Sequence, residues 1–200
     1  MGLKKLLCVI IALLLPAFSV QAAETEEGGG LYPCDFAFEE YWYDASVPAE
    51  NVLGALPAKA VLLMEASTGK VLYASNEKEH LPIASVTKVM ATLLVMEAID
   101  DGRLSTDDMV TVGERAASMG GSQVYLEVGE QMRVHDLLKA LVVVSANDAT
   151  VALGEHICGS EEAFISAMNA RAAELGMTDT HFVNTNGLPV EGHYSSAYDV

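Results

Sequence analysis

Residues 80–100 read HLPIASVTKVMATLLVMEAID, and they place Ser85 and Lys88 three positions apart in an otherwise apolar segment. Apolar residues recur at i, i+3 and i+4 from Ser85 to about Asp101, and Gly102 follows, so the pattern predicts a helix over this range. Because this helix is apolar on nearly every side, we expect it to be buried. Side chains three residues apart share one face of a helix, which brings the hydroxyl and the amine within reach of each other.

Two interpretations of this pair differ in the state of the lysine. If Lys88 is buried, desolvation and the positive end of the helix dipole lower its pKa from the ordinary value of ~10.4, and the neutral amine can take the proton of Ser85. Ser85 is then a nucleophile with its own base. If Lys88 instead extends to solvent, both polar groups only border a core helix. The pair by itself favours the second interpretation.

A second Ser-x-x-Lys match shows how little the spacing proves. Residues 60–65 and 71–74 are rich in β-formers and the turn between them carries Gly69, so the sequence predicts a β-hairpin. Ser67 and Lys70 lie in this turn, where serine and glycine serve the backbone conformation and the lysine is solvated. We therefore expect no chemistry from Ser67 and Lys70.

Further candidates lie at a predicted helix junction. After a charged, glycine-bearing loop over 113–132, residues 134–157 read as two helical runs that meet at Ser145-Ala146-Asn147. By itself this triplet is an ordinary helix-breaking cap, but its hydroxyl and amide could converge on the face of Ser85. A Ser-x-Asn triplet and a Ser-x-x-Lys pair make two thirds of a catalytic set whose third member is Lys-Thr-Gly on a strand.

The last part of the chain carries two capping signals. Ser160 is predicted to cap a helix over residues 161–175, which ends before Gly176. Ser196 and Asp199 have capping-box spacing, the signature of another helix, just before the final residue. One helical turn returns almost no hydrogen bonds, and a lone hairpin leaves apolar helix faces without a sheet to cover. We therefore expect a truncated chain, with more strands after residue 200.

Length, charge and histidine spacing limit the classes of protein. The 200 residues are 51% hydrophobic, enough for one medium domain or most of a larger one. A net charge of -17 would repel phosphate backbones, so no nucleic-acid partner is expected. The five histidines are scattered and no Cys-x-x-Cys or His-Glu-x-x-His spacing occurs, so we expect no metal and no cofactor, with His156 and Cys158 at a helix end.

The N-terminus has the order of a secretory signal peptide: a basic pair, an apolar run over 6–20 and a small-residue exit ending at Ala22. We expect residues 1–22 to be a signal peptide, residues 23–57 an acidic, Gly- and Pro-containing leader, and residues 58–200 a packed domain. An uncleaved N-terminal anchor is the alternative. The sequence does not fix whether Cys34 and Cys158 pair in an oxidising compartment, because disulfide geometry cannot be read from it.

Four segments together resemble a known family. They are 82–97 (PIASVTKVMATLLVME), 142–153 (VVVSANDATVAL), 182–189 (FVNTNGLP) and 193–199 (HYSSAYD). In order and spacing they resemble the serine-type D-alanyl-D-alanine carboxypeptidases, the low-molecular-mass penicillin-binding proteins, from about Ala58 to Val200. The resemblance implies an α/β (α+β) fold of the β-lactamase/transpeptidase type. Such a fold has a helical subdomain and an antiparallel sheet, whose C-terminal strands would be missing here.

The resemblance also implies a reaction, the removal of the terminal D-alanine from peptidoglycan stem peptides that end in D-Ala-D-Ala. Ser85 would be the acylated nucleophile, Lys88 its base, Ser145 a proton relay and Asn147 a ligand of the substrate amide. The Ser85 N–H would form half of an oxyanion hole. β-Lactam antibiotics would inhibit the enzyme. It would act at the extracytoplasmic face of a bacterial envelope, where a missing C-terminal segment could attach it to the membrane.

One departure from the family pattern concerns the carboxylate-binding strand. Lys-Thr-Gly is absent, and the similar string Thr68-Gly69-Lys70 is reversed and lies in the hairpin turn. In the family that strand supplies the second oxyanion donor, whose loss costs about 10²–10³ in rate. We expect residues 23–200 alone to be inactive and poorly folded. The alternatives are an inactive module that binds wall peptides or β-lactams, and a secreted β-lactamase; residues 182–189 and 193–199 suit the carboxypeptidase better.

Overall fold

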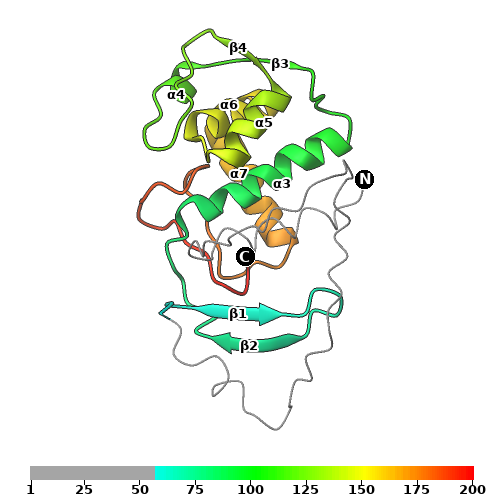
Figure 1. Ribbon diagram of the computed structural model, residues 1–200, viewed down its shortest axis with the longest axis vertical. Helices are drawn as coiled ribbons and strands as arrows, with labels where there is room; N and C mark the ends of the chain where they lie inside the picture. The colour runs from blue at the N-terminus through cyan, green and yellow to red at the C-terminus, as the bar shows by residue number, and fades with distance from the viewer. Residues whose placement is uncertain (1–56) are drawn as a thin grey trace, which may run out of the picture. The chain divides into compact units, whose positions relative to one another are not determined.

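The computed structural model describes residues 57–200, which form a mixed arrangement of helices and short antiparallel strands (Figure 1). The α+β class expected from the sequence is therefore confirmed for this part of the chain. The predicted signal peptide and its cleavage site, nearly all of the leader, and Cys34 lie outside the described residues. In chain order the elements are β1 (Val61–Met64), β2 (Val71–Ser75), the 3-10 turn η3 (Ala84–Val86), α3 (Thr87–Asp100), β3 (Met109–Thr111), α4 (Glu114–Ala117), β4 (Gln131–Arg133), α5 (Val134–Val143), α6 (Asn147–Cys158) and α7 (Glu161–Glu174).

The predicted hairpin is confirmed as the antiparallel pair β1–β2. Leu62 lies opposite Ala74 and Leu63 opposite Tyr73, and the register shifts between Leu63 and Met64. Gly69 has φ +71° in the connecting turn, a conformation that glycine adopts at little cost. The residues of β1 and β2 are exposed or half-buried, so the hairpin contributes little to the core of the described chain.

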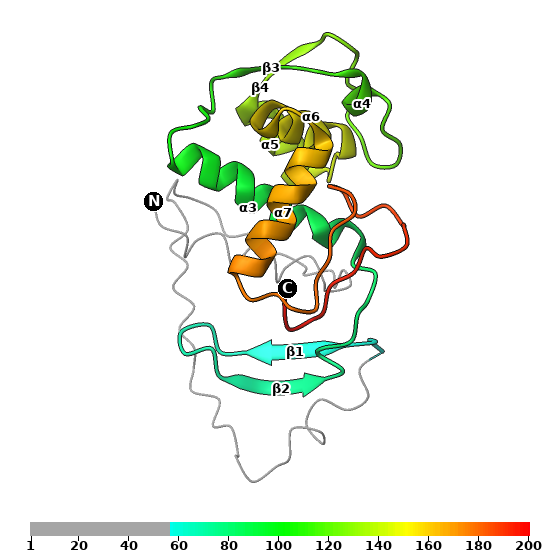
Figure 2. The same cartoon turned by 180° about the vertical axis from the view of Figure 1, so that it is seen from behind.

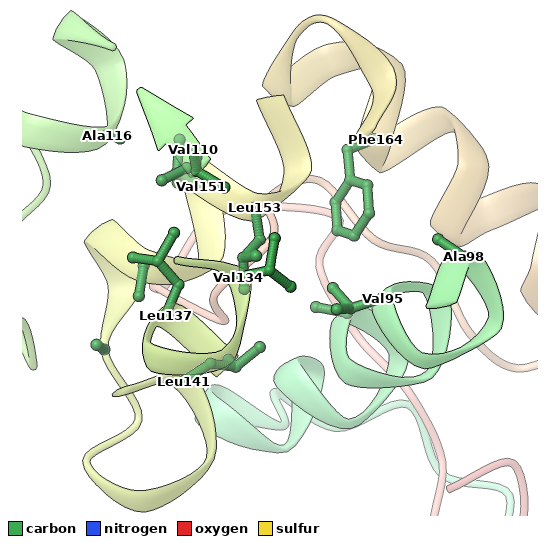
Figure 3. Packing of buried hydrophobic residues seen from close by; sticks show 14 of the residues in the cluster. Val95, Ala98, Val110, Ala116, Val134, Leu137, Leu141, Val151, Leu153 and Phe164 are labelled. Carbon is green, nitrogen blue, oxygen red and sulfur yellow. The ribbon is translucent and has the colours of Figure 1, made fainter. Parts of the chain in front are cut away.

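The predicted apolar helix is central to the core. Helix α3 packs against α5, α6 and α7, and Val89 and Asp100 are the exposed positions along its length. Figure 2 shows α7 crossing α3 on the side opposite to the view of Figure 1. In Figure 3, Val95 of α3 lies near Phe164 of α7 and Leu153 of α6, all of them fully buried. Burying each such side chain contributes roughly 1.5–3 kcal/mol, which fixes the helix in place.

The start of α3 differs from the prediction. The α-helix begins at Thr87, and Ser85 lies before it in the 3-10 turn η3. Ala84 has φ +45°, a left-handed conformation that a residue with a Cβ rarely adopts. This irregular turn, rather than a regular first helical turn, carries the candidate nucleophile.

The interpretation of residues 113–132 as a loop is wrong in part. They include α4 and the first two residues of β4, which pairs with β3 so that Val110 lies opposite Met132. Val110 is fully buried, so this small sheet belongs to the core. Strands of three residues contain too few alternating positions to produce a periodic signal in the sequence.

The other predicted helices are confirmed. Helices α5 and α6 meet at residues 144–146, and His156 and Cys158 lie in the last turn of α6. Ser160 caps α7 by accepting a hydrogen bond from Ala163 N at 3.1 Å. No helix within residues 57–200 is both long and apolar enough to cross a membrane.

The segment after α7 returns to the start of α3. Leu81 forms a bridge with Ser195, and His181 forms one with Tyr194. The predicted capping contact is formed, since Asp199 N donates to Ser196 Oγ at 3.1 Å, and the last residues form a turn. These contacts place residues 181–195 beside η3 and the first turn of α3.

Candidate active site

The predicted pair lies at the start of α3, with its two members in different environments. Lys88 Nζ lies 3.1 Å from Ser85 Oγ, within hydrogen-bond distance. Ser85 is exposed, whereas Lys88 is only 5% exposed. The interpretation that Lys88 extends to solvent is therefore wrong, because the packing of α3 against the rest of the core encloses its side chain.

Burial changes the acidity of the lysine. Desolvation lowers the pKa of Lys88 from 10.5 to about 8, because a charged ammonium is poorly stabilised away from water. Within residues 57–200 no carboxylate pairs with this ammonium, and its second partner is the carbonyl oxygen of Asn186 at 3.0 Å. A substantial neutral fraction is then present near neutral pH, as a proton acceptor requires.

The Asn186 carbonyl comes from a loop that approaches η3 very closely. Gly187 has φ +84°, and a Cβ at this position would lie 1.8 Å from the carbonyl oxygen of Ala84 and 2.9 Å from Thr87 Oγ1. Such contacts with the backbone exclude any side chain. The glycine therefore allows residues 184–188 to lie directly against the turn that carries Ser85.

Buried polar side chains also connect the same loop to the start of α7. Thr185 Oγ1 donates to Glu161 Oε1 at 3.0 Å, and Arg115 Nε donates to Glu161 Oε2 at 2.6 Å. Thr185 is fully buried and Glu161 is nearly so. The loop is thereby attached to the first turn of α7, and its position does not depend on its own sequence alone.

Asn186 also carries a polar group without a partner. Its Nδ2 is buried and has no hydrogen-bond partner within residues 57–200, while its Oδ1 accepts from Leu188 N at 3.0 Å. An unsatisfied buried donor costs about 1–3 kcal/mol, which native structures tolerate mainly where the group has a function.

Ser145 and Asn147 occupy the α5–α6 junction, as predicted. Ser145 has φ +57°, and Asn147 is the first residue of α6. Within the described part of the chain, neither side chain is hydrogen-bonded to Ser85 or Lys88. Asn147 Nδ2 instead donates to the carbonyl of Gly120 at 2.7 Å, and its Oδ1 accepts no hydrogen bond among residues 57–200. The roles expected for Ser145 and Asn147 therefore stay predictions.

Asp148 fixes the loop that contacts Asn147. Its carboxylate, 1% exposed, accepts from Val124 N at 3.0 Å and from Leu126 N at 3.1 Å. Asn147 N donates to Ser122 O at 2.7 Å. The start of α6 and residues 120–126 therefore form one hydrogen-bonded unit.

Sequence reasoning missed several residues of this site: Thr87, Asp148, Glu161, Thr185, Asn186 and His193. Thr87 Oγ1 is 2.7 Å from His193 Nε2, a buried contact between residues far apart in sequence. Residues 182–189 and 193–199 already stood out as motifs, and the Asn-Gly pair at 186–187 signals a tight turn. Nothing in the sequence indicates that this turn meets Lys88.

The fold and the site identify the class of protein first, and this class is the penicillin-binding proteins. The D-alanyl-D-alanine carboxypeptidase DacD from Francisella tularensis superposes with a TM-score of 0.71 at 36% identity, covering 79% of this chain and 40% of that one. Penicillin-binding protein D2 from Listeria monocytogenes, in its ampicillin-bound form, has a TM-score of 0.63 at 34% identity, covering 72% and 59%.

The sequence comparisons give the family. The family model for D-alanyl-D-alanine carboxypeptidase, Peptidase_S11, matches residues 45–200. D-alanyl-D-alanine carboxypeptidase DacF from Bacillus subtilis is 54% identical over 143 residues, which cover 72% of this chain and 37% of the relative. The chain belongs to the D-alanyl-D-alanine carboxypeptidase family, a family of serine hydrolases, and spans well under half the length of this curated relative.

Proposed function

We propose that the protein containing this chain is a serine-type D-alanyl-D-alanine carboxypeptidase that removes the terminal D-alanine from peptidoglycan stem peptides. One observation carries the proposal: an exposed hydroxyl, Ser85, lies 3.1 Å from the buried amine of Lys88. A nucleophile open to substrate with a base of lowered pKa beside it is what acyl transfer requires. Family membership over residues 45–200 supports the same reaction.

The geometry supports a specific role for Lys88. Its neutral amine can accept the Ser85 proton while one N–H still donates to Asn186 O, because a carbonyl only accepts hydrogen bonds. Ser85 Oγ then attacks the carbonyl carbon of the D-Ala-D-Ala bond, and the leaving D-alanine nitrogen takes the proton. Water subsequently cleaves the acyl ester and regenerates Ser85.

The remaining predicted residues have supporting roles in this proposal. Ser145 relays the proton toward the leaving nitrogen, and Asn147 Oδ1 accepts from the substrate amide. The Ser85 N–H acts as one oxyanion donor. Residues 58–200 would be the N-terminal and helical part of the catalytic domain, and the Lys-Thr-Gly strand that binds the substrate carboxylate would lie in another part of the same protein.

Location and inhibitors follow from the same proposal. The signal-peptide pattern of residues 1–22 favours export, so the enzyme would act at the extracytoplasmic face of the cell envelope. β-Lactams would acylate Ser85, as the ampicillin-bound relative suggests. Whether a further segment attaches the protein to the membrane would be decided by fractionating cells that express the complete reading frame.

The decisive experiment uses the product of the complete reading frame and a fluorescent penicillin. We expect stable labelling that is lost in Ser85→Ala and unchanged in Ser67→Ala, together with release of D-alanine from a peptide ending in D-Ala-D-Ala. Absent labelling would favour an inactive binding module, and rapid turnover of the label would favour a β-lactamase. Either result would contradict the proposal.

A further inference from the structure

The His193 side chain connects the segment after α7 to the start of α3. Its ring is buried, with 7% of the residue exposed, and packs edge-on against Phe182 with ring centroids 5.8 Å apart. Nε2 lies 2.7 Å from Thr87 Oγ1, and Nδ1 accepts from Val183 N at 3.0 Å. One ring therefore contacts both the residue preceding Lys88 and the segment that leads to Asn186.

These two contacts determine the tautomer. A backbone N–H only donates, so Nδ1 facing Val183 N must be unprotonated. The ring proton of neutral His193 is then on Nε2, which donates to Thr87 Oγ1. A second proton on Nδ1 would point at the Val183 N–H and break that hydrogen bond.

We propose that the neutral His193 ring is a positioning residue for the Ser85–Lys88 pair, acting through Thr87, and that protonation of the ring disengages the 183–193 segment from the start of α3. The proposal deepens the proposed function and rests on it for the catalytic readout. Thr87 lies between Ser85 and Lys88 in sequence and is fully buried, and a Cβ added at Gly187 of the same segment would lie 2.9 Å from its Oγ1. A displacement here would alter both the 3.1 Å pair and the Asn186 contact.

Two influences lower the pKa of His193, and one acidic side chain nearby would act against them. Burial, and secondarily the charge of His181, lower the pKa of His193, so the neutral form prevails near neutral pH. On α3 the nearest titratable group in sequence is Lys88, a cation when protonated, whereas η3 contributes none. Glu191 lines the same pocket of ≈ 400 Å³ as His193, with Ile83, Ala84 and Leu188, and is the one acidic side chain there.

The sign of the pH effect follows from the lowered pKa. The unfolded chain takes up a proton near the ordinary histidine value, before the folded protein does, so folded stability falls as pH drops below about 6.5. As pH falls, acylation would then lose two neutral groups that it needs, because Lys88 takes up a proton first and His193 takes one up at lower pH. Below the second transition the rate would fall about a hundredfold per pH unit, against about tenfold for a single ionisation.

Two variants separate the contacts of the ring. His193→Gln can still donate to Thr87 but does not titrate, and His193→Asn can still accept from Val183 N but does not reach Thr87. We would measure the rate of acylation by fluorescent penicillin from pH 4.5 to 9 in the product of the complete reading frame. His193→Gln should keep the rate at pH 7 within about threefold and lose the second acid transition, whereas His193→Asn should lose at least tenfold.

A matched control and a second readout keep the outcomes distinct. His135→Asn changes an exposed histidine on α5 and should leave the pH profile unchanged. The ¹⁵N spectrum of the labelled histidine rings should show His193 protonated on Nε2. Wild-type-like pH profiles in both His193 variants, or a proton on Nδ1, would overturn the inference. A protein that does not label at all would refute the proposed function, and the ring spectrum would then decide the His193 inference alone.

Discussion

Three Ser-x-x-Lys sequences occur in this chain, and the structure gives opposite environments to two of them, those that begin at Ser67 and Ser85. In the β1–β2 turn, Ser67 Oγ donates to Glu65 at 2.7 Å and Lys70 is exposed. At the start of α3, Ser85 is exposed and Lys88 is buried beside it. The spacing is the same in both places, so spacing does not create the chemistry.

The two lysines differ in the groups that surround them. The turn residues are satisfied locally, since Thr68 and Ser67 both hydrogen-bond to the Glu65 carboxylate. Lys88 instead donates to the carbonyl of Asn186, 98 positions away in sequence. A reactive lysine therefore needs a distant loop that buries it without giving it a carboxylate partner.

The most severe test disrupts that loop contact without replacing Ser85 or Lys88. Gly187→Ala should abolish penicillin labelling and lower the melting temperature strongly, because the new Cβ would meet Ala84 O at 1.8 Å. Gly69→Ala is the matched control, with φ +71° and open space around it, and should cost only about 1–2 kcal/mol. Normal labelling of Gly187→Ala would contradict the close approach of the loop to η3.

The next test exchanges the two lysines for residues of similar size. Lys88→Met should lower the acylation rate by about 10²–10⁴, the usual contribution of a general base, and Lys88→Arg should do the same because a guanidinium stays charged. Lys70→Met should leave the rate unchanged, since Lys70 is solvated. Stopped-flow fluorescence with a labelled penicillin measures these rates. Equal losses in both Met variants would remove the distinction between the two sites.

The pH profile measures the consequence of burial. Acylation should rise about tenfold per pH unit between about 6.5 and about 8 and level off above it, as Lys88 loses its proton. The unfolding free energy should also rise between about 8 and 10.5, because the unfolded lysine then holds a proton that the folded one has released. Chemical denaturation at several pH values checks the sign, and a flat stability across this range would contradict the lowered pKa.

The smallest effect is expected in the turn. Hydrogen bonds from Thr68 and Ser67 lower the pKa of Glu65 to about 2, so its ionised form supports the turn above about 4.5 and loses that support as pH falls toward 2. Glu65→Gln should speed amide exchange of Ser67 and Thr68 without changing labelling. A change in the acylation rate would connect the hairpin turn to the site, contrary to the comparison.

Much of the fold was predictable because its signals are local. The apolar periodicity of α3, the Ser160 cap of α7 and the glycine turn after Glu65 each act within a few residues. The strands β3 and β4 were not predictable, since three-residue strands carry no clear period and depend on pairing across 20 residues. The start of α3 was placed too early because the 3-10 turn at Ser85 requires Gly187 as its neighbour.

The sequence by itself determined the candidates, Ser85, Lys88, Ser145 and Asn147, because motif residues keep a fixed order along the chain. It left open whether Lys88 is buried or solvated, since a lysine in the first turn of an apolar helix can adopt either state. Only the tertiary structure decided that point, by bringing Asn186 and His193 to the first turn of α3. The acidity of a side chain depends on its solvation and its hydrogen-bond partners, and here the partners come from segments about a hundred residues away in sequence.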